Sequence, residues 1–124
     1  MAYDEAKEQI YYKFSAETLQ MTADEYLQEL ITFLNLTKQY KPQTILGEMQ
    51  EFQFSIPPSV QEWVGQYLFP AYQAIGMKKI AMILTQEFIP SLSIEQTMEE
   101  DKTNAFQTRY FENIQEAQAW LQEK

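Results

Sequence analysis

Several polar side chains in the middle of the sequence fall where predicted strands end, and their types could support ion binding or phosphorylation. The candidates are Glu48, Glu51, Ser55, Ser59, Gln86 and Glu87, with Glu112 after a later strand. Ligands of open α/β sheets bind beyond the carboxyl ends of parallel strands, and carboxylate and amide oxygens are ligands of Mg²⁺ and Ca²⁺. On a chain with a net charge of −9, the plainer interpretation is a set of solvated loop residues. We expect no metal site and no cofactor, and keep the first six residues as a candidate interaction or ligand loop.

The amino-acid composition excludes most enzyme classes. The chain has no cysteine and no histidine, so zinc–sulfur sites, thiolate nucleophiles, imidazole bases and Ser-His-Asp triads cannot be built. No pair of a nucleophile and a base is evident among the remaining residue types, and we expect a protein that is not an enzyme. The negative charge repels nucleic acid, and the densest basic cluster is only Lys78 with Lys79. We therefore expect no nucleic-acid partner.

The rest of the composition predicts one folded domain. Hydrophobic residues make up 45% of the chain, which is ample for a packed core and unlike a disordered protein. No apolar run approaches the ~20 residues that cross a bilayer. The N-terminal residues MAYDEAKEQ lack the apolar stretch of a signal peptide. We expect a single domain over residues 1–124, no transmembrane segment and a cytoplasmic location.

The elements that must position these residues are strands and helices that alternate along the chain. Period-2 patterns and short apolar runs predict strands over residues 3–6, 10–15, 44–49, 79–85 and 106–111. The first two are near enough in sequence to pair as an antiparallel hairpin. The order β-β-α-β-α-β-α-β-α then predicts an α/β domain with one mixed, mostly parallel sheet of four to five strands and helices packed against it.

The helices are predicted from apolar spacing and from end signals. They cover residues 22–40, 58–76 and 91–102, the last only weakly, and a final helix begins at residue 113. Capping-box pairs occur twice, as Thr22 with Glu25 and Asn113 with Glu116. Pro70 should kink or break the second helix near residue 69. Its Trp63 follows the apolar spacing, so we expect Trp63 to be buried against the sheet.

Three stretches resemble the SpoIIAA-like proteins, also described as STAS or SEC14-like domains. They are FENIQEAQAWLQ at 111–122, PPSVQEWV at 57–64 and AIGMKKIAMIL at 74–84, which look like the closing strand and helix, the second helix and the following turn and strand of that family. The resemblance covers nearly the whole chain and rests on packing motifs. It implies a four- or five-stranded mixed sheet with helices against it.

The resemblance does not carry the phosphoserine switch of STAS domains. That switch uses an Asp-Ser-Ser-Gly-type motif between a central strand and the next helix. The equivalent stretch here reads EFQFSIPPSVQEW and has no Asp-Ser dipeptide and no glycine. Ser55 and Ser59 are therefore expected to be dispensable, while Pro57 and Pro58 should set the entry into the helix.

Two functions remain open from the sequence. The first is a non-catalytic protein-interaction or regulatory module with an unknown protein partner. The alternative is a binder of a small apolar or lipid-like ligand, in the SEC14 sense. A closed apolar cavity of a few hundred Å³ between the helices and the sheet would favour the second function, and tightly packed helices would favour the first.

Overall fold

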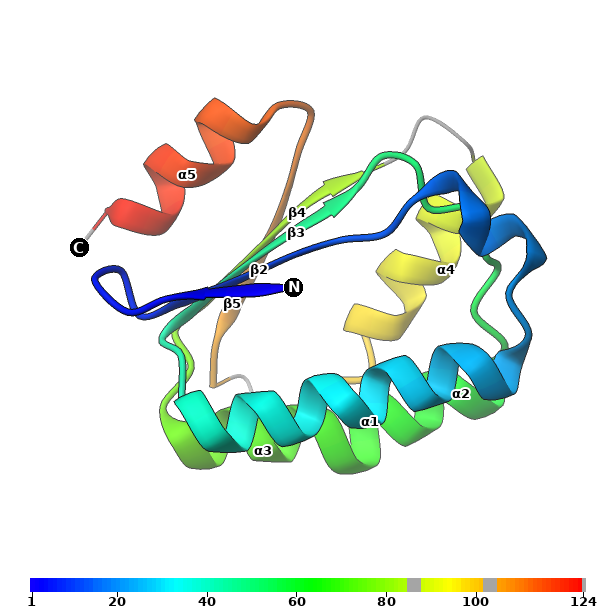
Figure 1. The fold of residues 1–124 in the computed structure, drawn as a ribbon, viewed down its shortest axis with the longest axis horizontal. Coiled ribbons are helices and arrows are strands. Elements are labelled where there is room, and N and C mark those ends of the chain that lie inside the picture. Colours follow the sequence, from blue (N-terminus) through cyan, green and yellow to red (C-terminus); the bar gives the residue numbers. More distant parts are fainter. Residues whose placement is uncertain (85–87, 102–104, 124) are drawn as a thin grey trace.

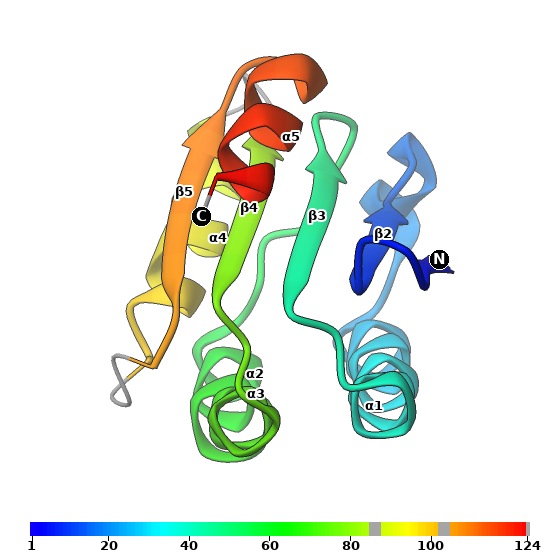
Figure 2. The ribbon, with the colours of Figure 1, turned by 90° about the vertical axis from the view of Figure 1, so that its left-hand side faces the viewer.

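A computed structural model describes residues 1–84, 88–101 and 105–123. Five strands form one sheet in chain order, seen nearly edge-on in Figure 1 and with its last four strands side by side in Figure 2. They are β1 (Ala2–Asp4), β2 (Gln9–Lys13), β3 (Thr44–Met49), β4 (Lys79–Leu84) and β5 (Gln107–Phe111). β1 pairs antiparallel with β2, and the other neighbouring pairs are parallel. The predicted mixed, mostly parallel sheet with an N-terminal hairpin is confirmed.

The helices are divided unequally between the two faces of this sheet. The helical elements are η1 (Ala16–Gln20), α1 (Ala23–Tyr40), α2 (Pro58–Trp63), η2 (Val64–Leu68), α3 (Phe69–Ile75), α4 (Phe88–Met98) and α5 (Ile114–Gln122). α1 to α4 lie on one face and α5 lies on the other (Figures 1 and 2). Connections between parallel strands are almost always right-handed, so the connections that join the strands in chain order all cross the same face of the sheet. This explains why α1 to α4 lie together. α5 follows β5 and folds back over the opposite face.

Local signals set the ends of the predicted helices. α1 begins with the expected capping box, in which the Thr22 hydroxyl accepts from the Glu25 N–H and the Glu25 carboxylate accepts from the Thr22 N–H. Before α5, the Asn113 side chain accepts from the Glu116 N–H at 2.9 Å, which is one of the two bonds of a capping box. The helix predicted over residues 91–102 begins earlier, at Phe88.

The second helical segment is interrupted by a π-helical turn, η2. The Phe69 N–H bonds to the Val64 carbonyl, five residues back. Pro70 follows at once in α3, near the predicted break at residue 69. Pro70 has no N–H to continue an α-helical ladder, and π-bulges are common where such a ladder is interrupted. Gly76 ends the segment as its C-cap, with a φ of 77° in the left-handed region that glycine favours.

The π-helical turn changes which side chains face the sheet. It inserts one residue into the helical repeat, so the buried residues after it are Phe69 and Tyr72, while Tyr67 remains 50% exposed. Trp63 is only partly buried, and its ring packs against that of Tyr67 with 5.6 Å between centroids. The prediction that Trp63 is buried against the sheet is met only in part, because the side chain packs against the core under α1 to α4 but keeps some exposed surface.

Alternate residues of the central strands supply two separate cores. In β3, Ile45 belongs to the core under α1 to α4 and Leu46 to the core under α5. In β4, Ile80 and Ala81 are divided in the same way. This alternation follows from the period-2 geometry of a strand, and it explains why both strands read as continuous apolar runs.

Candidate functional site

The predicted carboxylates at the end of β3 are engaged with other side chains. Glu48 accepts a hydrogen bond from the Tyr11 hydroxyl, and this bond, with burial, raises the pKa of Tyr11 to about 12. The Glu51 carboxylate lies 3.1 Å from the Lys13 ammonium, with both side chains about half exposed. Glu51, and more weakly Glu48, raise the pKa of Lys13. Both carboxylates thus raise the pKa of Lys13, and each has a partner in the protein, Tyr11 for Glu48 and Lys13 for Glu51.

The other predicted loop residues are not assembled into a site. Ser55 and Ser59 are exposed, the first before α2 and the second in its first turn. Gln86 and Glu87 lie outside the residues that the structure describes. Within residues 1–84, 88–101 and 105–123, no three carboxylates approach each other closely enough to hold a metal ion.

The stretch from residue 47 to 63 is a structural joint that packs into the core. Phe52 has no exposed surface and Ile56 is 4% exposed. The Gln53 N–H donates to the Thr18 hydroxyl at 2.8 Å, and the Gln61 amide donates to the Ile56 carbonyl at 2.9 Å. Pro57 is the N-cap of α2 and Pro58 its first residue, so the predicted role of the proline pair at the helix entry is confirmed.

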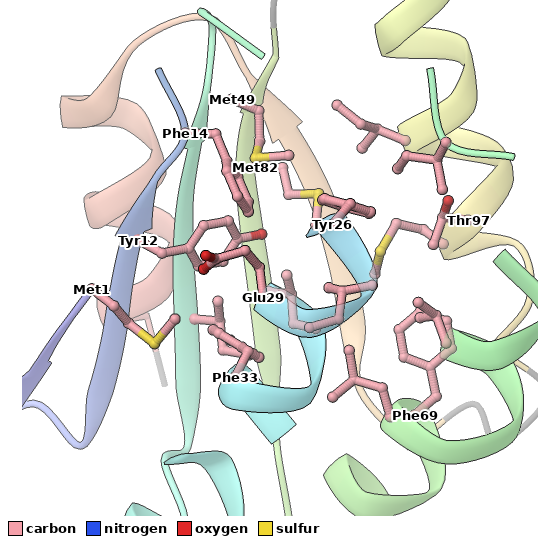
Figure 3. A pocket seen from close by; sticks show the side chains of 18 of the residues that line it. Met1, Tyr12, Phe14, Tyr26, Glu29, Phe33, Met49, Phe69, Met82 and Thr97 are labelled. Atoms are coloured by element: carbon pink, nitrogen blue, oxygen red, sulfur yellow. The ribbon is translucent and has the colours of Figure 1, made fainter. Parts of the chain in front are cut away.

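An apolar cavity of about 140 Å³ lies beside this joint, between the sheet and helices α1, η2, α3 and α4 (Figure 3). Its walls include Ile45 and Ile80 from the central strands and Val64, Leu68 and Ile94 from the helices. All five side chains are at most 5% exposed. It lies between the helices and the sheet, but it is smaller than the closed cavity of a few hundred Å³ that would favour a ligand binder.

The cavity reaches the surface near the first strands. Its exposed lining residues are Met1, Lys13 and Glu29, from the N-terminus, β2 and α1. Figure 3 shows Met1, Tyr12 and Glu29 along this side of the cavity. Lys13 and Glu29 are the charged lining residues within the described part of the chain. The opening therefore lies between the β1–β2 hairpin and α1.

Three tyrosines, Tyr12, Tyr26 and Tyr72, supply phenol groups to the cavity wall. Tyr26 and Tyr72 are 5% and 4% exposed, and Tyr12 is partly buried. Burial raises the pKa of all three, and the phenols are near enough that charge on Tyr12 would raise the pKa of the other two further. In the part of the chain that the structure describes, none of the three hydroxyls has a hydrogen-bond partner in the protein. At neutral pH they are protonated and able to donate.

Two phenylalanines hold the tyrosine rings in place. Phe33 contacts Tyr12 at 5.3 Å and Tyr72 at 6.5 Å between ring centroids. Phe14 contacts Tyr12 and Tyr26, both at 5.8 Å. These edge-to-face and tilted contacts are favourable for aromatic rings, so the three phenols form one aromatic wall.

Gly47 provides the space into which Tyr12 extends. Gly47 of β3 is paired with Tyr12 of β2 in the sheet. A Cβ at Gly47 would lie 2.5 Å from Cζ of Tyr12 and 2.6 Å from its hydroxyl oxygen. The Tyr12 ring therefore crosses the backbone of β3, and its hydroxyl points toward the cavity (Figure 3).

Sequence reasoning missed these tyrosines, although part of the signal is visible. Tyr12 lies in the same strand phase as Ile10, and Tyr26 lies on the apolar side of the helix predicted over residues 22–40. Both could have been identified as inward-facing phenols without nearby polar partners. Tyr72 could not, because the π-helical turn that brings it inward leaves no clear mark in the sequence.

Two broader observations bear on what kind of protein this is. Among the residues described, no helix is both long and apolar enough to cross a membrane. α1 has the length, at 18 residues, but it is amphipathic. Comparison of the chain with protein-family models, curated proteins and solved structures finds no match. The structure shows an α/β fold with a five-stranded mixed sheet, and no family is assigned by these comparisons.

Proposed function

We propose that this protein is a non-catalytic binding domain that takes up a small apolar molecule in the cavity between the sheet and helices α1, η2, α3 and α4. The observation that carries the proposal is the cavity itself. It is apolar, opens to the surface beside Met1, and is lined by three phenol hydroxyls that have no partner among the residues the structure describes. Ligand sites are typically concave, mostly apolar and equipped with a few polar groups that orient the ligand.

The size of the cavity limits the ligand. Engineered cavities of ~150 Å³ in another protein bind benzene, and a cavity of about 140 Å³ is comparable. A single aromatic ring or a short branched chain is therefore the expected size. Four of the six methionines, Met1, Met49, Met82 and Met98, line the cavity. Because methionine side chains are flexible and adapt to irregular partners, the wall can accommodate a somewhat larger molecule.

The tyrosines favour binding over catalysis. A general base or nucleophile needs a pKa near the working pH, whereas burial raises the pKa of Tyr12, Tyr26 and Tyr72 away from neutrality. With no histidine or cysteine in the chain, these groups serve as hydrogen-bond donors and acceptors.

A relationship to the SpoIIAA-like (STAS or SEC14-like) proteins remains our proposal for the family. The five-stranded mixed sheet with helices against it agrees with what the resemblance implies. An interaction or regulatory module with a protein partner is the second candidate function. The exposed side chains of Glu51, Ser55 and Ser59 support it, because they lie close in sequence to Met49 and Ile56, which line the cavity.

The test is a titration of the purified protein with toluene, followed by two-dimensional NMR of the backbone amides. We expect saturable shifts centred on the cavity wall and an increase in melting temperature. Val64→Phe should fill the cavity and abolish the shifts, because Val64 lines it. Val60→Phe is the matched control, since Val60 is buried in the same core but does not line the cavity. Absence of saturable shifts in the unmodified protein would refute ligand binding at this site.

A further inference from the structure

The hydroxyls of Tyr12, Tyr26 and Tyr72 specify the chemistry of the molecule that the cavity holds. Buried polar groups nearly always have a hydrogen-bond partner, and Tyr26 and Tyr72 as whole residues are only 5% and 4% exposed. In the described part of the chain, no protein atom serves as that partner for any of the three. None of the three phenol oxygens is among the fully enclosed unpartnered atoms of the described residues, so each keeps accessible surface and can be reached by a molecule in the cavity.

We propose that the ligand is a small neutral molecule, apolar over most of its surface, with one oxygen that accepts a hydrogen bond from this tyrosine cluster. This inference rests on the proposed function and adds the chemical class of the ligand. An alcohol, phenol, aldehyde or ketone of the size of one ring has the required form.

A neutral ligand follows from the charges around the cavity. The charged lining residues are Lys13 and Glu29, and both are exposed at the opening. Lys13 is already paired with Glu51 at 3.1 Å. A carboxylate inside the cavity would lose its hydration and gain no buried cation, which is a large desolvation cost. The net charge of −9 also repels anions from the opening.

A single oxygen acceptor follows from the geometry of the cluster. The Tyr12 hydroxyl lies over Gly47, at the centre of the sheet. The rings of Tyr26 and Tyr72 are each linked to that of Tyr12 through one phenylalanine. The donors are thus gathered on one aromatic wall, while Ile80, Val64 and Leu68 present only carbon. A molecule with its oxygen at one end satisfies both surfaces.

The experiment compares toluene with phenol, which have the same number of heavy atoms and differ by a methyl or hydroxyl group. Binding of each is measured by NMR titration to the unmodified protein and to Tyr12→Phe, Tyr26→Phe and Tyr72→Phe. At least one variant should weaken phenol binding relative to toluene by about 5–10-fold, the effect of one hydrogen bond. Toluene affinity should change less than about 2-fold. Benzoate, as the charged probe, should not bind the unmodified protein.

Tyr11→Phe is the matched control. Tyr11 is adjacent to Tyr12 in β2, but it belongs to the opposite core and its hydroxyl bonds to Glu48. This variant should leave the ratio of phenol to toluene affinity unchanged. Melting temperatures supply a second measurement. Tyr11→Phe should lower the melting temperature, whereas the cavity variants should maintain or raise it, because the hydroxyls they remove form no hydrogen bond with the described residues.

The outcomes separate this inference from the proposed function. If toluene binds and no cavity variant changes the ratio, the cavity binds apolar molecules and the inference about the oxygen is wrong. If benzoate binds more tightly than phenol, the ligand is an anion and the inference is also wrong. If neither toluene nor phenol binds the unmodified protein, the proposed function fails, and the inference fails with it.

Discussion

The two faces of the sheet are built from alternate residues of the same strands, and they differ in how closely the helices pack against them. On the face covered by α5, Ala81 and Ala117 have no exposed surface, and their small side chains allow α5 to approach closely. The Lys79 ammonium donates to the carbonyls of Trp120 and Glu123, both at 2.8 Å. On the other face, four helical elements surround a cavity of about 140 Å³.

Two adjacent tyrosines of β2 show what this difference means. Tyr11 faces the α5 side and its hydroxyl bonds to Glu48, whereas Tyr12 faces the cavity and its hydroxyl has no partner among the described residues. Phenylalanine at position 12 would lose no hydrogen bond to the described residues, so the Tyr12 hydroxyl contributes less to stability than the Tyr11 hydroxyl does. This contrast agrees with a packing role for the α5 face and with the binding function that we propose for the cavity face.

The largest expected effect is alkaline unfolding, which reports on the cavity face. Burial raises the folded-state pKa of Tyr12, Tyr26 and Tyr72 above the ordinary value of 10.0. Their stabilising contribution is fully present below pH 10 and is lost as the pH rises from there, because only the unfolded chain ionises. Each tyrosine removes about 1.4 kcal/mol per pH unit, and together they remove about 4 kcal/mol by pH 11.

Urea unfolding at pH 8 to 11.5 measures this loss. Tyr72→Phe should remove about a third of the pH dependence that the three cavity tyrosines contribute to the free energy of unfolding. Tyr11 and Tyr110, with pKa values of about 12, also lower the stability as the pH rises. A stability that stays constant up to pH 11 would mean that the phenols ionise freely, and the cavity face would then be as open as the surface.

The next largest effect concerns the α5 face. Trp120 is 6% exposed and packs on Phe111, with 5.7 Å between ring centroids. Trp120→Ala should lower the free energy of unfolding by about 3–5 kcal/mol. Trp63→Ala, at a partly buried position, should cost less than about 3 kcal/mol. Denaturant midpoints for both variants test the ranking, and equal losses would show that Trp63 is a full core residue after all.

A smaller effect is expected from Gly47→Ala, which places a methyl group against Tyr12. Since the new Cβ would lie 2.5 Å from Cζ of Tyr12, the ring must move, and we expect a loss of about 1–3 kcal/mol together with altered phenol binding. Gly76→Ala is the comparison: it meets no atom within 4 Å but has a φ of 77°, so its cost should be about 1 kcal/mol from backbone strain. Phenol titration distinguishes the two, because Gly76→Ala should leave binding unchanged.

The smallest effect is expected at the joint before α2. Ser55 and Ser59 are exposed, so the double change Ser55→Ala, Ser59→Ala should alter stability by less than about 0.5 kcal/mol. Thermal unfolding of the double variant, with phosphoproteomics of the native protein, provides the measurement. Stoichiometric phosphate at either serine, or a protein partner lost only in the variant, would show that this loop is a regulatory switch.

The elements that could be predicted from the sequence are those with local signals. The β3 strand was predicted over the residues it occupies, because it is a short apolar run with a proline before it. The start of α1 was predicted from one capping pair, Thr22 with Glu25. Such signals lie within a few residues of the feature that they specify.

The candidate site could not be predicted in the same way. Glu48 and Glu51 were chosen for their position at a strand end, but their partners Tyr11 and Lys13 come from another strand. The cavity depends on how five elements fit together, and a π-helical turn decides that Tyr72 rather than Tyr67 faces it. A volume left between packed side chains has no counterpart in a pattern of residue types.

The strands lie in the sheet in the same order as in the chain, and this affects how the protein folds. Each strand of the sheet pairs with its neighbours in sequence, so β1 and β2 can join before β3 is available, and β4 can add to β3 in turn. Sheet assembly can therefore begin while ribosomal synthesis continues. α5 contacts β3, β4 and β5 and can dock only when all three are paired. Its docking covers the apolar face that the paired strands leave exposed, which makes that step the point at which a newly made chain becomes less vulnerable to aggregation.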